Sequence, residues 1–311
     1  MNHRMFLPFS LLAVIMLCSC NQQRSATRGK PVLCVTIEPV RYFTEAVAGE
    51  YFDVISIVPK GASPESYDPT PKQLIDINHC QAYLRIGYIG FERAWCDRLL
   101  ENSPHLKVYN LSENIDLIHE EEHDSHHESQ SNYAEEETHS HVHVNGVEPH
   151  IWNSTINARI IIDNILHSLT ELDKEHTDYY TCRRDSLFKE IDHLDSLIIS
   201  TLSQSAGTDA FMIYHPALSY FARDYGLLQI PIEEHGKEPS AASLKALVSK
   251  AKEEGVTTIF VQPEFDKHNA ELVAAQVGAR IATVNPLSYN WQEEMLHVAQ
   301  ELVQPTEHAE P

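Results

Sequence analysis

The chain has 311 residues, enough for one large domain or two modest domains with a substantial apolar core. Its 45 acidic residues outnumber its 23 basic residues, which gives a formal net charge of −22 at pH 7. So acidic a surface argues against binding to nucleic acid and favours cationic partners.

The first twenty residues resemble the leader of a bacterial lipoprotein. A basic start (His3, Arg4) precedes an apolar run over residues 5–17 that is too short to span a membrane as a helix. The run ends in Leu17-Cys18-Ser19-Cys20, which resembles a lipobox. The resemblance implies a signal peptide over 1–20, lipidation of Cys20, and a chain anchored on the periplasmic or outer face of a bacterial membrane. An ordinary secreted chain is the alternative.

Residues 21–30 are polar and are predicted to be a flexible leash, after which short apolar segments alternate with helical patterns. Strands are expected at 31–37, 52–59, 82–87, 107–112, 210–215, 256–263 and 279–286. Helices are expected between them, one of them with Ser240 as its N-cap and Gly255 just past its end. Strands alternating with helices predict an α/β fold of two lobes (31–173 and 206–304), each a parallel sheet flanked by helices, with a short tail at 305–311.

A polar insert over 117–147 interrupts the first lobe. It is dense in imidazoles and carboxylates and carries no Lys or Arg. Such a segment cannot bury enough apolar surface to fold alone, and imidazole nitrogen is a good ligand for zinc and other transition metals. We therefore predict a disordered, metal-capturing His-rich loop, with a merely solubilising acidic loop as the alternative. Its histidines are His119, His123, His126, His127, His139, His141 and His143.

The stretch between the lobes contains neither Gly nor Pro from His150 to Ala206. One helix is expected over 155–172, followed by a long helix over 174–205 with an apolar stripe at helical spacing. About 30 residues of helix would span about 45 Å at 1.5 Å per residue. The long helix is therefore predicted to be a rigid link between the two lobes, so that the lobes make small rigid-body adjustments instead of a wide hinge closure.

Candidate ligands follow the carboxyl ends of the expected strands, where open parallel sheets collect their ligands. Glu65 follows strand 52–59, His150 lies in the loop after strand 107–112, His215 ends strand 210–215, and Asn285 ends the strand beginning at 279. Two imidazoles and a carboxylate converging from separate strands would suit Zn²⁺.

Enzyme signatures are weak by comparison. His119-Glu120-Glu121-Glu122-His123 matches HExxH formally, but its polar flanks offer no apolar stripe to bury such a helix. The pairs Glu233/Glu234 and Glu264/Asp266 are predicted to be solvated turns or helix caps. No nucleophile elbow, P-loop or Gly-rich dinucleotide turn is present in the sequence. We therefore expect no catalytic residues.

Five short motifs occur in order around the long helix. They are GASPESYDPTP, EPHIW, IYHPALSYFARDYGL, EPSAASL and TVNPLSYN. Together they resemble the metal-binding receptors of bacterial ABC importers (cluster A-I), and in particular the zinc-type, ZnuA-like members, over residues 30–304. The resemblance implies two α/β lobes, one metal ion in the cleft between them, and no catalysis.

The resemblance also implies which residues of this chain occupy the family's four metal-ligand positions. The second and third ligands fall on His150 and His215. The first is usually His in SPHxY, where this chain has Glu65, and the fourth is usually Asp, where it has Asn285. An amide is a poorer zinc ligand than a carboxylate, so Asn285 is the doubtful member, and water or a His of the insert could replace it.

The function that follows is that of a lipid-anchored, monomeric receptor. It captures Zn²⁺ as its transported ligand and delivers it to the permease of an ABC importer. The same fold serving manganese, a secreted zinc hydrolase using His119, Glu120 and His123, and a metal-buffering adhesin without a transporter are the alternatives. Cys34, Cys80, Cys96 and Cys182 include no CxxC pair, and we expect most of them to be small buried apolar residues.

Overall fold

The computed structural model describes residues 29–119, 146–204, 209–233 and 236–305. The signal peptide, Cys20, all but the ends of the His-rich insert, and most of the tail lie outside the described residues. Within the described ranges, no helix is both long and apolar enough to cross a membrane.

The first lobe is a four-stranded sheet in the order β2-β1-β3-β4, with every pair parallel. Its strands are β1 (Val32–Val35), β2 (Asp53–Ser56), β3 (Ala82–Arg85) and β4 (Lys107–Asn110). The helices after the first three strands are α1 (Glu38–Ala48), α2 (Pro71–Asn78) and α3 (Gly90–Asn102). The predicted strand–helix alternation is confirmed. The strands are shorter than the apolar runs from which they were predicted.

The second lobe repeats this pattern in the order β6-β5-β7-β8, again all parallel. The elements are β5 (Ala210–Ile213), α6 (Ser219–Tyr225), β6 (Leu228–Pro231), α7 (Ala241–Glu253), β7 (Thr258–Val261), α8 (His268–Val277), β8 (Arg280–Thr283) and α9 (Trp291–Val303). The short edge strand β6 and the helix α9 had not been predicted.

Local sequence explains where several helices begin and end. The Thr70 side chain caps α2 in a capping box with Gln73, and Pro71 occupies the first turn. Ser240 accepts a hydrogen bond from the Ser243 amide at 3.1 Å and caps α7, as predicted. The helix α6 ends at Gly226, whose φ of 68° is the left-handed conformation that glycine tolerates best.

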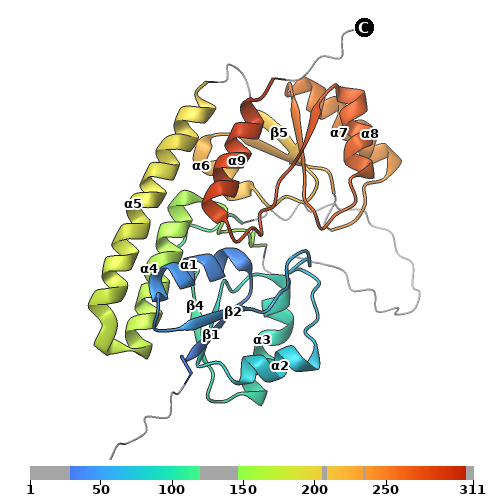
Figure 1. The fold of residues 1–311 in the computed structure, drawn as a ribbon. Helices are drawn as coiled ribbons and strands as arrows, with labels where there is room; N and C mark the ends of the chain where they lie inside the picture. The colour runs from blue at the N-terminus through green and yellow to red at the C-terminus, as the bar shows by residue number, and fades with distance from the viewer. Residues whose placement is uncertain (1–28, 120–145, 205–208, 234–235, 306–311) are drawn as a thin grey trace, which may run out of the picture. The chain divides into compact units, whose positions relative to one another are not determined.

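Two helices connect the sheets in the sequence: α4 (Thr155–Leu172) and α5 (Thr177–Leu202), with a single 3₁₀ turn (Lys174–His176) between them. The long helix α5 packs on α1 and α4 beside the first sheet and on α9 beside the second (Figure 1). From Pro31 onward the contacts join both lobes into one compact unit. This packing is compatible with the predicted link, although the helix is shorter than 174–205.

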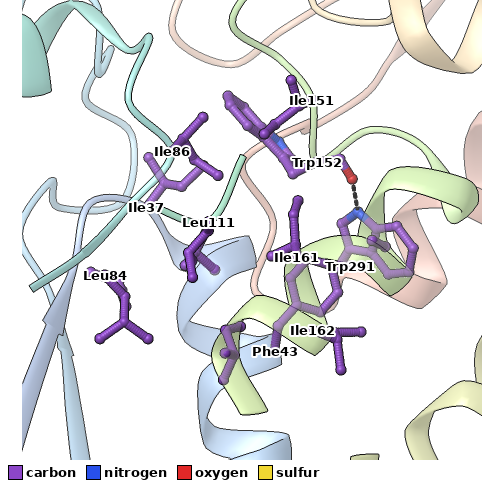
Figure 2. Packing of buried hydrophobic residues seen from close by; sticks show 14 of the residues in the cluster. Ile37, Phe43, Leu84, Ile86, Leu111, Ile151, Trp152, Ile161, Ile162 and Trp291 are labelled. Atoms are coloured by element: carbon purple, nitrogen blue, oxygen red, sulfur yellow. Dashed lines mark hydrogen bonds between the residues drawn. The ribbon is translucent and has the colours of Figure 1, made fainter. Parts of the chain in front are cut away.

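Buried aromatic residues hold the loop after His150 against the second lobe. The Trp152 indole donates to the Pro286 carbonyl at 2.8 Å, and the Trp291 indole donates to the Trp152 carbonyl at 2.9 Å. Figure 2 shows the Trp291 ring beside Ile161 and Ile162 of α4 and Phe43 of α1, and the Trp152 ring beside Ile151. Both tryptophans are essentially inaccessible to solvent, so this contact fixes the backbone near His150.

The described cysteines are all free thiols. Cys34, Cys80 and Cys96 are buried, as expected of small apolar residues, and Cys182 is exposed on α5. Burial raises the pKa of the Cys34 thiol well above its ordinary value, and neighbouring Cys80 adds to this effect. All three buried cysteines belong to the hydrophobic core and act as packing residues.

Candidate metal centre

Two histidines from different lobes lie side by side, with their rings in a T-shaped arrangement. His215 follows the carboxyl end of β5, and His150 lies in the loop that returns from the insert toward α4. Their Nε2 atoms lie 3.1 Å apart. Two nitrogens bound to one tetrahedral zinc ion at 2.0–2.1 Å would be separated by about 3.3 Å. The pair is therefore spaced nearly as two ligands of a single ion would be.

Each imidazole is oriented by a carboxylate on its other nitrogen. Glu148 contacts Nδ1 of His150, and Glu233 lies 2.6 Å from Nδ1 of His215. Because Nδ1 is occupied in both rings, each Nε2 is presented toward the other histidine. Glu148 and Glu233 are 5% and 8% exposed, so they sit inside the protein with the rings that they orient.

The sequence reading had missed both carboxylates. Glu233 had been predicted to lie in a solvated turn or a helix cap, and this was wrong, because the loop after β6 folds inward onto His215. Glu148 stands two residues before His150 in the EPHIW motif, so the motif contained a usable signal. Of the other pair, Asp266 is exposed and accepts from the His268 amide at 2.7 Å, one residue before the N-cap of α8.

The backbone of His215 is fixed by Gln262. Its side-chain amide donates to the His215 carbonyl at 2.6 Å, and its Oε1 accepts from the His215 amide at 3.3 Å. The ring of Phe265 stacks on the imidazole, with centroids 5.1 Å apart. The position of His215 is thus set by the neighbouring strand β7 and the loop that follows it.

Glu65 reaches the same pocket from the first lobe. Its Oε2 accepts a hydrogen bond from the Gly90 amide at 3.2 Å, at the N-terminus of α3, where a negative charge is favoured. Its Oε1 is buried and has no hydrogen-bond partner among the described residues. Glu65 therefore has one oxygen anchored and one oxygen available to a ligand.

Glu65, His150 and His215 line one pocket, together with Ser63, Pro64, Trp152, Ala217, Gln262, Glu264, Phe265, Pro286 and Leu287. The structure does not bring Asn285 into this pocket. Asn285 lines a neighbouring pocket, and its side-chain oxygen accepts from the Leu287 amide at 3.1 Å. Glu264 lines both pockets and had not been predicted as a site residue.

The electrostatics of the pocket favour positive charge. Burial lowers the pKa of His215, but the hydrogen bond and charge of Glu233, with further contributions from Glu65 and Glu148, outweigh it and leave the pKa above its ordinary value. No three His, Cys, Asp or Glu side chains among the described residues are grouped tightly enough to hold a metal as they stand. Binding an ion would thus require a carboxylate to move onto the paired imidazoles.

The formal HExxH motif is represented by His119 alone, since Glu120 and His123 lie outside the described residues. His119 is exposed and forms an isolated antiparallel bridge with Val147. The bridge brings the two ends of the His-rich insert side by side. The other histidines of the insert also lie outside the described residues.

Comparison with known proteins places these features in a family. Residues 33–304 match the family model described as "ZnuA: Zinc-uptake complex component A periplasmic". The chain belongs to this family. It thus has the fold of the zinc-type metal receptors, and the resemblance drawn from its motifs is confirmed.

Individual relatives agree with this assignment. The chain is 29% identical to the high-affinity zinc uptake system protein ZnuA of Bacillus subtilis, over 93% of this chain and 92% of that protein. It is 26% identical to the zinc-binding lipoprotein AdcA of Streptococcus pneumoniae, of whose length it spans 55%. A crystal structure of ZnuA superposes with a TM-score of 0.77 at 30% identity, covering 88% of this chain and 98% of that one. A ZnuA deletion mutant with zinc bound gives the same TM-score.

Proposed function

We propose that this protein is an extracytoplasmic receptor that captures Zn²⁺ between its two lobes and delivers it to the permease of an ABC importer. The observation that carries the proposal is the pair of Nε2 atoms, one from each side of the pocket, 3.1 Å apart with a carboxylate behind each ring. Family membership and the zinc-binding names of its relatives support it.

In this proposal His150 and His215 are the nitrogen ligands, and Glu65 supplies an oxygen at the position where the motif resemblance implies a histidine. Two imidazoles favour zinc over manganese, which prefers oxygen ligands. The ion is cargo and takes part in no reaction. The pocket therefore needs donor groups and shielding from water, and the proposal assigns no catalytic role to any residue.

The proposal extends to the parts of the chain outside the described residues. A lipid on Cys20 would anchor the receptor to the membrane surface, and residues 21–30 would act as its leash. The His-rich insert would bind zinc weakly and raise its concentration near the pocket. The two lobes would be joined by α5 and work as a monomer.

The affinity and stoichiometry of zinc binding, measured on the purified protein and two variants, test this proposal. His215→Ala should weaken the tight site on the order of 100-fold, because one of the paired nitrogens is lost. Deleting residues 120–145 should leave one tight site and remove only the weaker additional ions. The His119–Val147 bridge allows a short linker to close this deletion. Loss of all tight binding on deletion would contradict the model.

Two rival functions predict different results. A manganese receptor would retain Mn²⁺ in direct competition with Zn²⁺, which calorimetry measures. A zinc hydrolase would cleave peptides in a metal-dependent way and lose this activity on Glu120→Gln. His150 is buried and His215 is partly buried, whereas His119 is exposed, and this contrast favours the receptor over the hydrolase.

A further inference from the structure

Most polar side chains of the metal pocket are already committed to other contacts. The Ser63 hydroxyl accepts from the Glu65 amide at 3.4 Å, and Gln262 holds the His215 backbone through both ends of its amide. The Trp152 indole is bound to Pro286. Besides the two imidazoles and Glu65, the remaining polar group of the pocket is Glu264.

Glu264 stands in the loop after β7, on the His215 side of the pocket. No hydrogen bond or ion pair joins its carboxylate to another described residue, and its partly buried side chain lines two adjoining pockets. Burial raises the pKa of Glu264, although its own backbone amide and nearby His215 act in the opposite direction. Partial burial disfavours the charged form of this carboxylate, and a bound cation would favour it.

The coordination number of zinc calls for one more donor. Two neutral imidazoles and Glu65 supply three donor atoms, whereas a tightly held zinc ion takes four ligands. Asn285 does not meet this need. Its side chain is a neutral amide whose oxygen accepts from the Leu287 amide, and it lines the neighbouring pocket.

We propose that the carboxylate of Glu264 is the fourth ligand of the bound zinc ion, in the role that the sequence had assigned to Asn285. The inference rests on the proposed function. It adds that both lobes contribute one imidazole and one carboxylate as ligands of the ion. On zinc binding, Glu264 would turn from the wall shared by the two pockets toward the paired Nε2 atoms.

The test measures the zinc dissociation constant by competition with a chromophoric chelator, and the visible spectrum of the Co²⁺-loaded protein. Glu264→Gln keeps the size of the side chain and removes its charge. It should weaken zinc binding on the order of tenfold or more and change the Co²⁺ spectrum, since a ligand is lost. Glu271→Gln, which removes an exposed carboxylate from α8 in the same lobe, should alter neither. Asn285→Ala should weaken zinc binding less than Glu264→Gln.

The results of this test distinguish a failure of the Glu264 inference from a failure of the proposed zinc-receptor function. Glu264→Gln with wild-type affinity and a wild-type Co²⁺ spectrum would overturn the inference alone. A larger loss in Asn285→Ala than in Glu264→Gln would also overturn it, because the fourth ligand would then be the amide. A wild-type protein without a tight zinc site would overturn the proposed function, and the inference with it.

Discussion

Gly90 lies so close to Glu65 that a Cβ atom added at position 90 would stand 2.3 Å from the backbone oxygen of Glu65. The contact belongs to a junction in which the N-terminus of α3 holds the loop that carries Glu65. The Gly90 amide donates to Glu65 Oε2 at 3.2 Å, and the Phe91 amide donates to the Pro64 carbonyl at 2.9 Å. Glycine is required here because of the close approach of two backbones.

Gly90→Ala should therefore displace Glu65 from the pocket. The methyl group meets backbone atoms that cannot rotate away, so the 63–65 loop has to move. We expect zinc affinity to fall on the order of tenfold, and the free energy of unfolding to fall by about 1–3 kcal/mol from overpacking. Chelator competition and thermal unfolding of the metal-free protein measure the two effects.

Gly255→Ala is the matched control for this substitution. Gly255 has a φ of 65° and open space around its Cβ position, so alanine there strains only the backbone. It should cost about 1–2 kcal/mol of stability and leave the zinc affinity unchanged. Equal zinc affinity in Gly90→Ala and Gly255→Ala would refute a role for Gly90 in positioning Glu65.

The sequence predicted the fold more completely than the site. The fold was predicted from local signals: apolar runs for strands, glycines after helices, and the cap at Ser240. The structure contains the elements that these signals predicted. The strand β6 (Leu228–Pro231) was missed because only Ile230 of its four residues is buried, and an edge strand of this kind lacks an apolar signal.

In the site, the two histidines stood in distinctive motifs, whereas the groups that orient them did not. Glu233 follows an edge strand and resembles a surface carboxylate until the loop folds inward onto His215. Asn285 was chosen for its place after a strand. The direction of its side chain, toward Leu287, depends on the turn that follows β8 and could not be inferred from spacing.

Glu233→Gln should weaken zinc binding through His215. The amide oxygen of glutamine can still accept from Nδ1, so the ring keeps its orientation, but the negative charge that strengthens the imidazole as a ligand is lost. Removing such a supporting group typically costs about 10–100-fold in metal affinity. The pKa of His215 in the metal-free protein should also fall, because Glu233 is the main group that raises it against burial.

Titration of the His215 ring by NMR, beside chelator competition, measures both effects. Glu253→Gln is the control, since it removes an exposed carboxylate from α7 in the same lobe. If Glu233→Gln lowered the zinc affinity without lowering the pKa of His215, the loss would have to come from a general disturbance of the loop.

Zinc affinity should decrease as the pH falls, and the decrease should begin above the ordinary histidine pKa of about 6.5. Burial lowers the pKa of His215, but Glu233, Glu65 and Glu148 together raise it beyond that effect. Because zinc binds the neutral ring, a proton that is held more tightly competes with the ion over a higher pH range. Zinc dissociation constants measured at a series of pH values test this prediction. A loss of zinc affinity confined to pH values below the ordinary histidine pKa would contradict it.

In the metal-free protein, the contribution of His215 to folding stability should change with pH in the opposite direction to the zinc affinity. A folded-state pKa that is raised above the unfolded value adds stability that is fully present below the unfolded pKa. That stability is lost as the pH rises through the raised pKa of the folded state. The difference in melting temperature between the wild type and His215→Ala, both without metal, should therefore be larger in acid than at alkaline pH.

Trp152→Phe should weaken the connection between the lobes. The Trp152 indole donates to the carbonyl of Pro286 beside the second sheet, and Trp152 lies two residues after His150. Phenylalanine preserves the apolar packing seen in Figure 2 but leaves the Pro286 carbonyl without its donor, at a cost of about 1–3 kcal/mol. The cost should appear as a lower free energy of unfolding in denaturant. Zinc affinity should fall with it, because the His150 loop is less firmly held.

Trp95→Phe provides the comparison for this last prediction, because the Trp95 indole donates to Asp68 at 3.1 Å in an exposed setting. Water can replace that bond, so the loss of stability should be within about 0.5 kcal/mol. If Trp152→Phe cost no more than Trp95→Phe, the hydrogen bond to Pro286 would contribute nothing to holding His150 opposite His215. The spacing of the two imidazoles would then have to be maintained by the packing of α5 against α1, α4 and α9.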